Sequence, residues 1–134
     1  MIKFKVFPGL DNWMAKESEL YWEVRVYHTR NNMQRFWGKK GASAVVIPRT
    51  HTWLWEGKEV VLPKLGLVLF NRDELFGEIV VHEAVHMATW YLRRTRRSVN
   101  LGTDCDDREE RLAYATGVCA DQISRNFHRL GLWN

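Results

Sequence analysis

The hydrophobic pattern of this chain changes its period close to Asn71, and the change divides the sequence into two halves of different structure. Just before it, Leu65 to Phe70 (LGLVLF) is a short apolar run bounded by turn formers, which by its length suits a buried strand. Just after it, Asn71 and Glu74 have the spacing of a capping box, and a helical pattern continues to about Arg94. The pattern predicts a buried strand that leads directly into a long helix.

A second helix is expected after a break at residues 100–103. Thr103 is its predicted N-cap, and the acidic residues that follow suit the positive end of the helix dipole. One apolar face continues along it, formed by Leu112, Cys119, Ile123, Phe127 and Leu130. Gly131 follows His128 and Arg129 and is the predicted stop, so the chain should end in a long helix.

The beginning of the chain has the period of strands. Residues Ile2 to Phe7 and Trp22 to Tyr27 alternate apolar and polar side chains, which predicts two half-buried strands. Gly9 to Leu20 between them is ambiguous, because Asp11 or Asn12 could cap a short helix there.

The middle of the first half contains turn formers and short apolar segments. Residues 30–32 and 38–41 have the composition of turns. Ala44 to Ile47, ended by Pro48, and Thr52 to Trp55 have the composition of short strands, which suggests a β-meander. A strand-rich first half followed by two long helices defines the expected fold class, α+β.

Length and composition indicate one folded domain. A chain of 134 residues has room for one hydrophobic core, so residues 1–134 are expected to form a single domain. The sequence begins without the pattern of a secretory signal and contains no apolar stretch long enough to span a membrane, which favours a cytoplasmic protein. Cys105 and Cys119 lack CxxC spacing, so free thiols are expected, with Cys119 in the core.

The charge permits a nucleic-acid partner without requiring one. The formal net charge is +4, and the basic residues are dispersed except for residues 93–97 (RRTRR). The simplest interpretation of that run is a solvated helix C-terminus, where cations meet the negative end of the dipole. The alternative is a nucleic-acid-binding module that uses RRTRR, Lys39, Lys40 and exposed tryptophans, although Trp22, Trp53 and Trp90 are more simply explained by core and strand packing.

The motif HEAVH within the first long helix is the feature that most directly indicates chemistry. His82 and His86 are four residues apart, so on a helix they share one face and can present two imidazole nitrogens to one zinc ion. Glu83 falls to the side, where a carboxylate can hold a water beside the metal and take its proton rather than act as a ligand. The motif therefore predicts two metal ligands and one general base.

The competing interpretation is a buried helix with two hydrogen-bonded histidines, because so short a motif also occurs by chance. Two arguments favour the metal. One face of the helix is apolar, and its expected members are Val81, Ala84, Val85, Ala88 and Leu92. The histidines share a separate stripe with Ile79 and Thr89, and a polar pair buried there without partners would be costly.

A catalytic zinc requires a third protein ligand, and the start of the second helix offers Glu109 and Glu110. The remaining histidines, His28, His51 and His128, are isolated and are expected to be surface or structural residues. Periodicity places Glu109 nearer the middle of the apolar face and Glu110 at its edge.

HEAVH followed by EERLAYATG, residues 109–117, resembles the gluzincin class of zinc metallopeptidases, and in particular its short phage-encoded or prophage-associated members. The resemblance covers roughly residues 65–123 and implies a zincin-like fold with a glutamate of the second helix as third ligand. In that class a small residue commonly stands two helical turns after this glutamate, and Gly117 stands seven after Glu110, which favours Glu110. Tyr114 departs from the class, because thermolysin-like enzymes have an aspartate at that position, so no partner that would orient the histidines is identified.

The resemblance implies a zinc-dependent metallopeptidase that acts on a protein or peptide, with His82, His86 and Glu110 holding the metal and Glu83 as general base. A strand near LGLVLF would border its cleft and pair with an extended peptide. A second interpretation keeps the zinc but not the catalysis, as a zincin-like module that binds a protein partner. The basic nucleic-acid-binding module is the third.

Overall fold

The computed structural model describes residues 1–9, 20–39, 41–49, 52–95 and 105–134, with the backbone alone for residues 52–55, 59–61 and 105–108. Its strands are β1 (Ile2–Val6), β2 (Tyr21–Tyr27), β3 (Val45–Pro48), β4 (Thr52–Trp55), β5 (Lys58–Val61) and β6 (Lys64–Asn71). Its helices are α1 (Arg30–Trp37), the short 3₁₀ helix η2 (Arg72–Glu74), α2 (Gly77–Thr95) and α3 (Cys105–Arg129). The described part of the chain is a mixed α+β structure, as the sequence pattern predicts.

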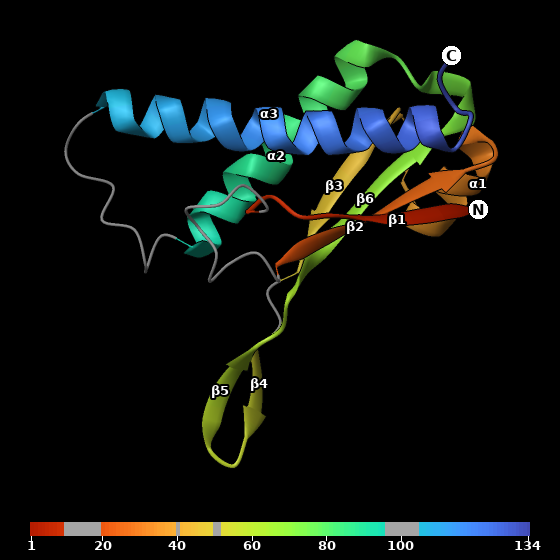
Figure 1. Cartoon of the computed structure of the whole chain (residues 1–134). Coiled ribbons are helices and arrows are strands. Elements are labelled where there is room, and N and C mark those ends of the chain that lie inside the picture. The colour runs from red at the N-terminus through yellow and green to blue at the C-terminus, as the bar shows by residue number, and fades with distance from the viewer. Residues whose placement is uncertain (10–19, 40, 50–51, 96–104) are drawn as a thin grey trace.

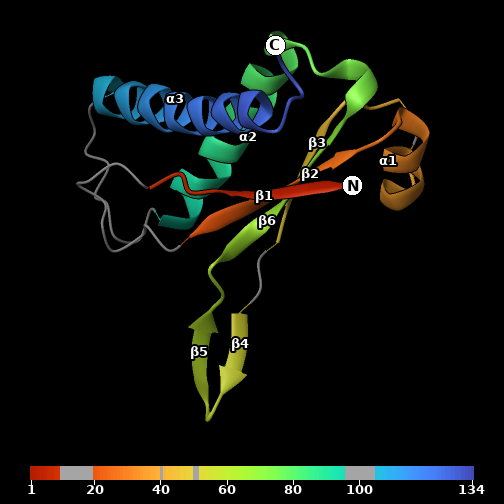
Figure 2. The same ribbon diagram turned by 45° about the vertical axis from the view of Figure 1, so that its right-hand side comes forward.

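The centre of the fold is a four-stranded sheet in the order β1-β2-β6-β3. β1 and β2 are antiparallel, β2 and β6 are parallel, and β3 is antiparallel to β6. Helices α2 and α3 cover one face of this sheet, and the short α1 lies on the opposite face (Figures 1 and 2). This places β3 at the edge of the sheet, beside α2.

β6 is buried on both faces because helices lie on both sides of it. Val68 and Phe70 face the core that α2 and α3 cover. Leu67 and Leu69 face the smaller core against Met33 of α1. A strand covered on both faces has a continuous apolar sequence rather than an alternating one, which explains LGLVLF and confirms the predicted strand.

Gly66 lets β3 and Trp22 approach β6 closely. Its φ of +154° is a conformation that residues with side chains rarely adopt. A Cβ atom there would lie 2.1 Å from the carbonyl oxygen of Ile47 and 2.9 Å from the Trp22 ring. The close packing of β3 on β6 therefore requires glycine at this position.

The segment between β6 and α2 differs from the predicted capping box. The side chain of Asn71 accepts a hydrogen bond from the backbone N–H of Asp73 at 3.1 Å, which caps η2 rather than α2. α2 itself begins at Gly77 and its described part ends at Thr95. The prediction of a long helix is thus confirmed, but its start lies several residues later because the chain first turns through η2.

The predicted turn at residues 30–32 is wrong, because these residues begin α1. Thr29 caps this helix by accepting a hydrogen bond from the N–H of Asn32 at 3.1 Å. Gly38 ends it in a left-handed conformation with φ of 75°. The polar, asparagine-containing start is the N-terminal turn of a short helix whose only buried residue is Met33.

The predicted meander is also wrong in its pairing. β3 pairs with β6 and not with its neighbours in sequence, whereas β4 and β5 pair with each other as a separate hairpin. Glu56 and Gly57 form the tip of that hairpin, both with positive φ. The hairpin projects away from the sheet and helices (Figure 1).

The chain end is packed onto the body of the fold. After α3 the chain turns at Gly131, with φ of 72°, as predicted for a helix stop. The Trp133 indole then donates a hydrogen bond to the carbonyl oxygen of Leu75 at 2.8 Å. The expected features at residues 10–19 and at Thr103 lie outside the described residues. None of the described helices is long and apolar enough to cross a bilayer.

Candidate metal centre

The buried face of α2 is rotated about the helix axis relative to the apolar face expected from the sequence. Its buried apolar members are Val80, Ala84, Met87, Ala88 and Tyr91. Val81 and Val85, which were expected to be buried, are 52% and 39% exposed. The prediction was wrong there because α2 packs against both the sheet and α3, so its buried arc is set by two neighbours and not by hydrophobicity alone.

His82 and His86 lie together on an exposed stripe of α2. Their Nε2 atoms are 3.2 Å apart, and their ring centroids are 4.9 Å apart. Both residues are exposed. The expected burial of this pair is therefore wrong, since water reaches both rings. Two imidazole nitrogens nevertheless converge at this point of α2.

This convergence fits a tetrahedral metal ion. With Zn–N bonds of about 2.0–2.1 Å, two nitrogens separated by 3.2 Å subtend an angle of roughly 100–105° at the metal, which is close to tetrahedral. The same separation also suits a hydrogen bond between two neutral imidazoles. The histidine pair thus has the geometry of two zinc ligands and also that of a hydrogen-bonded pair.

Glu83 differs from the histidines in being buried. It is only 5% exposed, and burial raises the pKa of its carboxyl group above the usual value, while the neighbouring His82 opposes this shift. Among the described residues the carboxylate has no hydrogen-bond or salt-bridge partner. A carboxyl group of this kind binds a proton more readily than an exposed one, as general-base catalysis near neutral pH requires.

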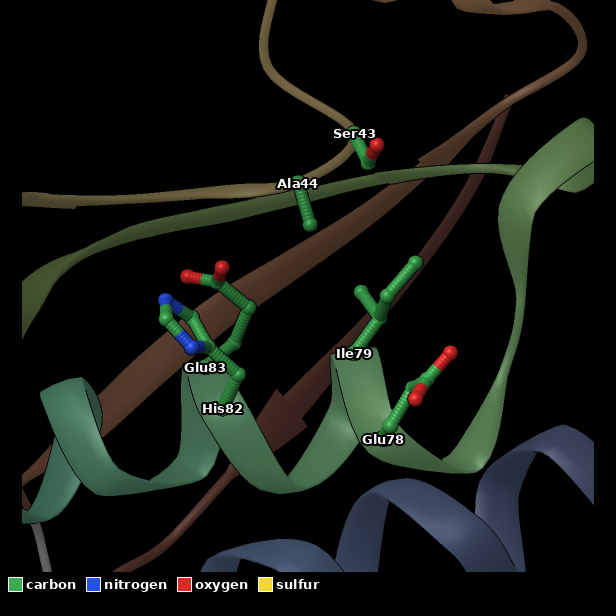
Figure 3. A pocket seen from close by; sticks show the side chains of 6 residues that line it. All are labelled: Ser43, Ala44, Glu78, Ile79, His82 and Glu83. Carbon is green, nitrogen blue, oxygen red and sulfur yellow. The ribbon is translucent and has the colours of Figure 1, made fainter.

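Two adjoining hollows lie between α2 and the segment that leads into β3. The larger, of about 380 Å³, is lined by Ser43, Ala44, Glu78, Ile79, His82 and Glu83. The smaller, of about 190 Å³, is lined by Ala44, Val45, Val46, His82, Glu83, His86 and Trp90. Figure 3 shows Ser43 and Ala44 facing the side chains of α2 across the larger hollow. HEAVH therefore lies along an open cleft whose other wall is the edge strand β3.

The sequence did not identify the residues of that opposite wall. Ser43 and Ala44 carry no motif, and only the pairing of β3 with β6 brings them to α2. Glu78 and Trp90 had a detectable signal, because each stands four residues from a histidine of the motif and so lies one turn along the same helix.

Asn71 holds this wall in place from the interior. It is fully buried, and its side-chain amide donates a hydrogen bond to the carbonyl oxygen of Ser43 at 2.9 Å. The same amide lies 3.9 Å from the sulfur of Met33. A buried polar group needs such partners, and here they connect the end of β6 to the start of the cleft wall.

The described structure does not group Glu109 or Glu110 with the two histidines. Glu109 and Glu110 are both exposed on α3, and neither is among the residues that line the two hollows. Across the described part of the chain, no three His, Cys, Asp or Glu side chains are grouped so that they could hold one metal ion together. Gly117 is exposed, and no described atom outside its own helix segment lies within 4 Å of the position of a Cβ there, so packing supplies no reason for a glycine two turns after Glu110.

Two arginines of the basic run make contacts within the fold. Arg94 donates hydrogen bonds to the carbonyl oxygens of Leu62 and, at 3.4 Å each, of Lys64 and Arg49. Burial lowers the pKa of this guanidinium from its usual value. Arg93 instead stacks over the Trp90 ring, 5.1 Å from its centroid. Arg93 and Arg94 of RRTRR therefore make contacts near the base of the hairpin and at the edge of the cleft, rather than forming a freely solvated cationic end.

The other residues whose burial was predicted agree with the structure in some cases and differ in others. Trp22 and Cys119 are fully buried, as expected for core residues, whereas Trp90 is 36% exposed beside the cleft, so its assignment to the core was wrong. His28 and His128 are exposed, as expected. His51 and the side chain of Trp53 lie outside the described residues.

Comparison of the chain with protein-family models, with curated proteins and with solved structures finds no match. Three features of the molecule itself point to its function: the converging nitrogens of His82 and His86, the buried carboxyl group of Glu83, and the open cleft beside β3.

Proposed function

We propose that this protein is a zinc-dependent metallopeptidase with a zincin-like arrangement of cleft and helix. The observation that carries the proposal is that the Nε2 atoms of His82 and His86 converge to 3.2 Å in the same hollow that the buried carboxyl group of Glu83 lines. A hydrogen-bonded histidine pair alone would not need a neighbouring buried carboxylate or an adjoining cleft.

Each residue has a separate role in this proposal. His82 and His86 hold the metal through Nε2, while Glu83 orients water, takes its proton and later passes that proton to the leaving amine. The raised pKa of Glu83 suits both steps, because the group must alternate between its charged and neutral forms. Bound zinc would act as a Lewis acid on the water and on the substrate carbonyl.

The substrate in this proposal is an extended peptide that pairs with β3. Among the described residues β3 pairs only with β6, so its other edge offers backbone donors and acceptors. Val45 and Val46 of this strand line the same hollow as His86. A peptide added there by β-augmentation would pass directly over the histidine pair.

Glu110 is the third ligand that we propose, with Glu109 as the alternative. Both stand near the start of α3, the helix that packs against α2. A zinc site with three protein ligands and one open position is the arrangement that hydrolytic zinc enzymes use.

The decisive experiment is the zinc content of the purified, dialysed protein. We expect about one zinc per chain in the wild type and loss of that zinc in His82→Ala and Glu110→Ala. Glu109→Ala should retain it, and His128→Ala is the matched control, because His128 is exposed at the far end of α3. Absence of tightly held metal from the wild type would refute the proposal.

The second experiment separates catalysis from metal binding. Glu83→Gln preserves size and should leave zinc content and fold unchanged, but should abolish hydrolysis of a peptide library that the wild type cleaves. Full turnover by this variant would contradict the assigned role of Glu83.

A catalytically silent zinc module is the second candidate, and the observation that favours it is that the described residues group only two histidines as ligands. It is distinguished by a hydroxamate, which binds tightly only where the zinc has an exchangeable position. Zinc without hydroxamate binding would favour the silent module.

A further inference from the structure

The larger hollow beside HEAVH has two chemically different parts. Ala44 and Ile79 contribute apolar surface next to His82, Ala44 from the segment before β3 and Ile79 from α2. Ser43 and Glu78 also line this hollow, on the side away from His82, and contribute a hydroxyl and a carboxylate (Figure 3). A ligand group that fits this space has an apolar stem and a polar, positively charged end.

The carboxylates near the start of α2 differ in whether they already have a partner within the protein. Glu74 pairs with Arg30 at 3.2 Å, and Asp73 accepts a hydrogen bond from the backbone N–H of the same arginine. Glu78 has neither an ion pair nor a hydrogen bond with any described residue, and its position in the first turn of α2 already stabilises its charge through the helix dipole.

Glu83 adds a second acidic group at the inner end of the hollow. It is 5% exposed, lines the hollow, and lacks a hydrogen-bond or salt-bridge partner among the described residues. The exposed carboxylate of Glu78 makes its side of the hollow electronegative, and no described lysine or arginine side chain is among the lining residues. A cationic group is therefore favoured there and an anionic group is disfavoured.

We infer that this hollow is a specificity pocket that takes a lysine or arginine side chain of the substrate, with the aliphatic stem along Ala44 and Ile79 and the cation at Glu78. The inference rests on the proposed function, because it places the residue next to the cleaved bond in this pocket. The protein would then be selective for peptides that carry a basic residue at that position.

The test measures binding instead of turnover. The probes are the hydroxamates of N-acetyl-lysine, N-acetyl-leucine and N-acetyl-glutamate, titrated into the zinc-loaded protein. We expect the lysine derivative to bind about threefold to fivefold more tightly than leucine and about tenfold more tightly than glutamate, as an exposed ion pair allows. The preference should shrink at about 0.5 M salt, because Glu78 is exposed.

The variant Glu78→Gln should remove the preference for lysine while leaving zinc content and affinity for the leucine derivative unchanged. Asp121→Asn is the matched control, because it removes one exposed carboxylate from α3, where Asp121 pairs with Arg125 at 2.8 Å. That control should retain the wild-type preference.

The outcomes distinguish this inference from the proposed function. Equal affinities for the three hydroxamates, or a lysine preference that survives Glu78→Gln, would overturn the pocket assignment alone. A protein that holds zinc but binds none of the three lacks the open coordination position, and both proposals would then fall.

Discussion

Replacing Gly66 by alanine should push β3, the strand that forms one wall of the cleft, away from its neighbour β6. The added Cβ would lie 2.1 Å from the carbonyl oxygen of Ile47 and 2.9 Å from both Pro48 Cα and the Trp22 ring. Ordinary contacts of a Cβ are 3.4–4 Å, so β3 would have to move by more than an ångström relative to β6. The two nearest atoms belong to backbone and cannot be relieved by a change of rotamer.

The magnitude follows from two contributions. Alanine at a φ of +154° costs about 1–3 kcal/mol in backbone strain, and forcing extra volume into a packed interior costs about 1–3 kcal/mol more. We expect the free energy of unfolding to fall by about 4 kcal/mol, a large part of the total for a domain of this size. The midpoint of thermal unfolding should then fall by roughly 10–20 °C.

The assay is thermal and urea unfolding followed by circular dichroism, with Gly117→Ala as the matched control. Gly117 is a helical glycine of α3 with no described atom within 4 Å of its Cβ position. The same substitution there should stabilise the protein by about 1 kcal/mol, because alanine is the better helix former. A Gly66→Ala variant that unfolds within about 3 °C of the wild type would refute the argument that β3 packs this closely on β6.

Two further predictions concern groups near and far from the cleft. Arg94→Met retains the aliphatic packing but loses the hydrogen bonds to Leu62, Lys64 and Arg49, so urea unfolding should show a loss of about 1–2 kcal/mol. Arg93→Met loses the contact with Trp90, the one interaction of Arg93 within the described part of the chain, and should lower the free energy of unfolding by less than about 1 kcal/mol. An equal effect of the two variants would contradict the tethering role of Arg94. Burial raises the pKa of the Cys119 thiol to about 12, so iodoacetamide at pH 8 should leave the peptide that contains Cys119 unmodified in mass spectra until the protein is unfolded in urea. Because the pKa of this thiol in the folded state lies above the usual value of 9.0, the free energy of unfolding should also fall as the pH rises above about 9. Alkylation of Cys119 in the native protein at pH 8 would show that the core opens more readily than this burial implies.

The elements that could be predicted from the sequence are those whose apolar pattern is set mainly by one packing environment. β1 and β2 alternate because one face of each meets the core, and α3 has one apolar stripe because it lies on the surface of the fold. β6 was predictable for the opposite reason, since burial on both faces produced a continuous apolar run. HEAVH was predictable as a pair of converging imidazoles because the geometry of one helix sets that distance.

The elements that were missed depend on contacts between distant segments. α1 is a short helix with one buried residue, so its sequence had the composition of a turn. The exposure of Val81 and Trp90 and the burial of Glu83 depend on how α2 packs between the sheet and α3, which no pattern within α2 records. Ser43 and Ala44 reach the cleft only because β3 pairs with β6 across an intervening hairpin.

The amino-acid sequence was sufficient to predict the α+β class, the strand that precedes the long helix, and two imidazoles and one carboxylate on a single turn of that helix. Local periodicity and helix geometry are sufficient for these features, because they involve residues that are close in sequence. The folded chain was needed to see that the imidazoles are exposed, that the carboxyl group is buried with a raised pKa, and that an edge strand forms the opposite wall of the cleft. These features arise from the packing of segments far apart in the chain, where burial and desolvation are properties of the assembled fold and not of any one segment.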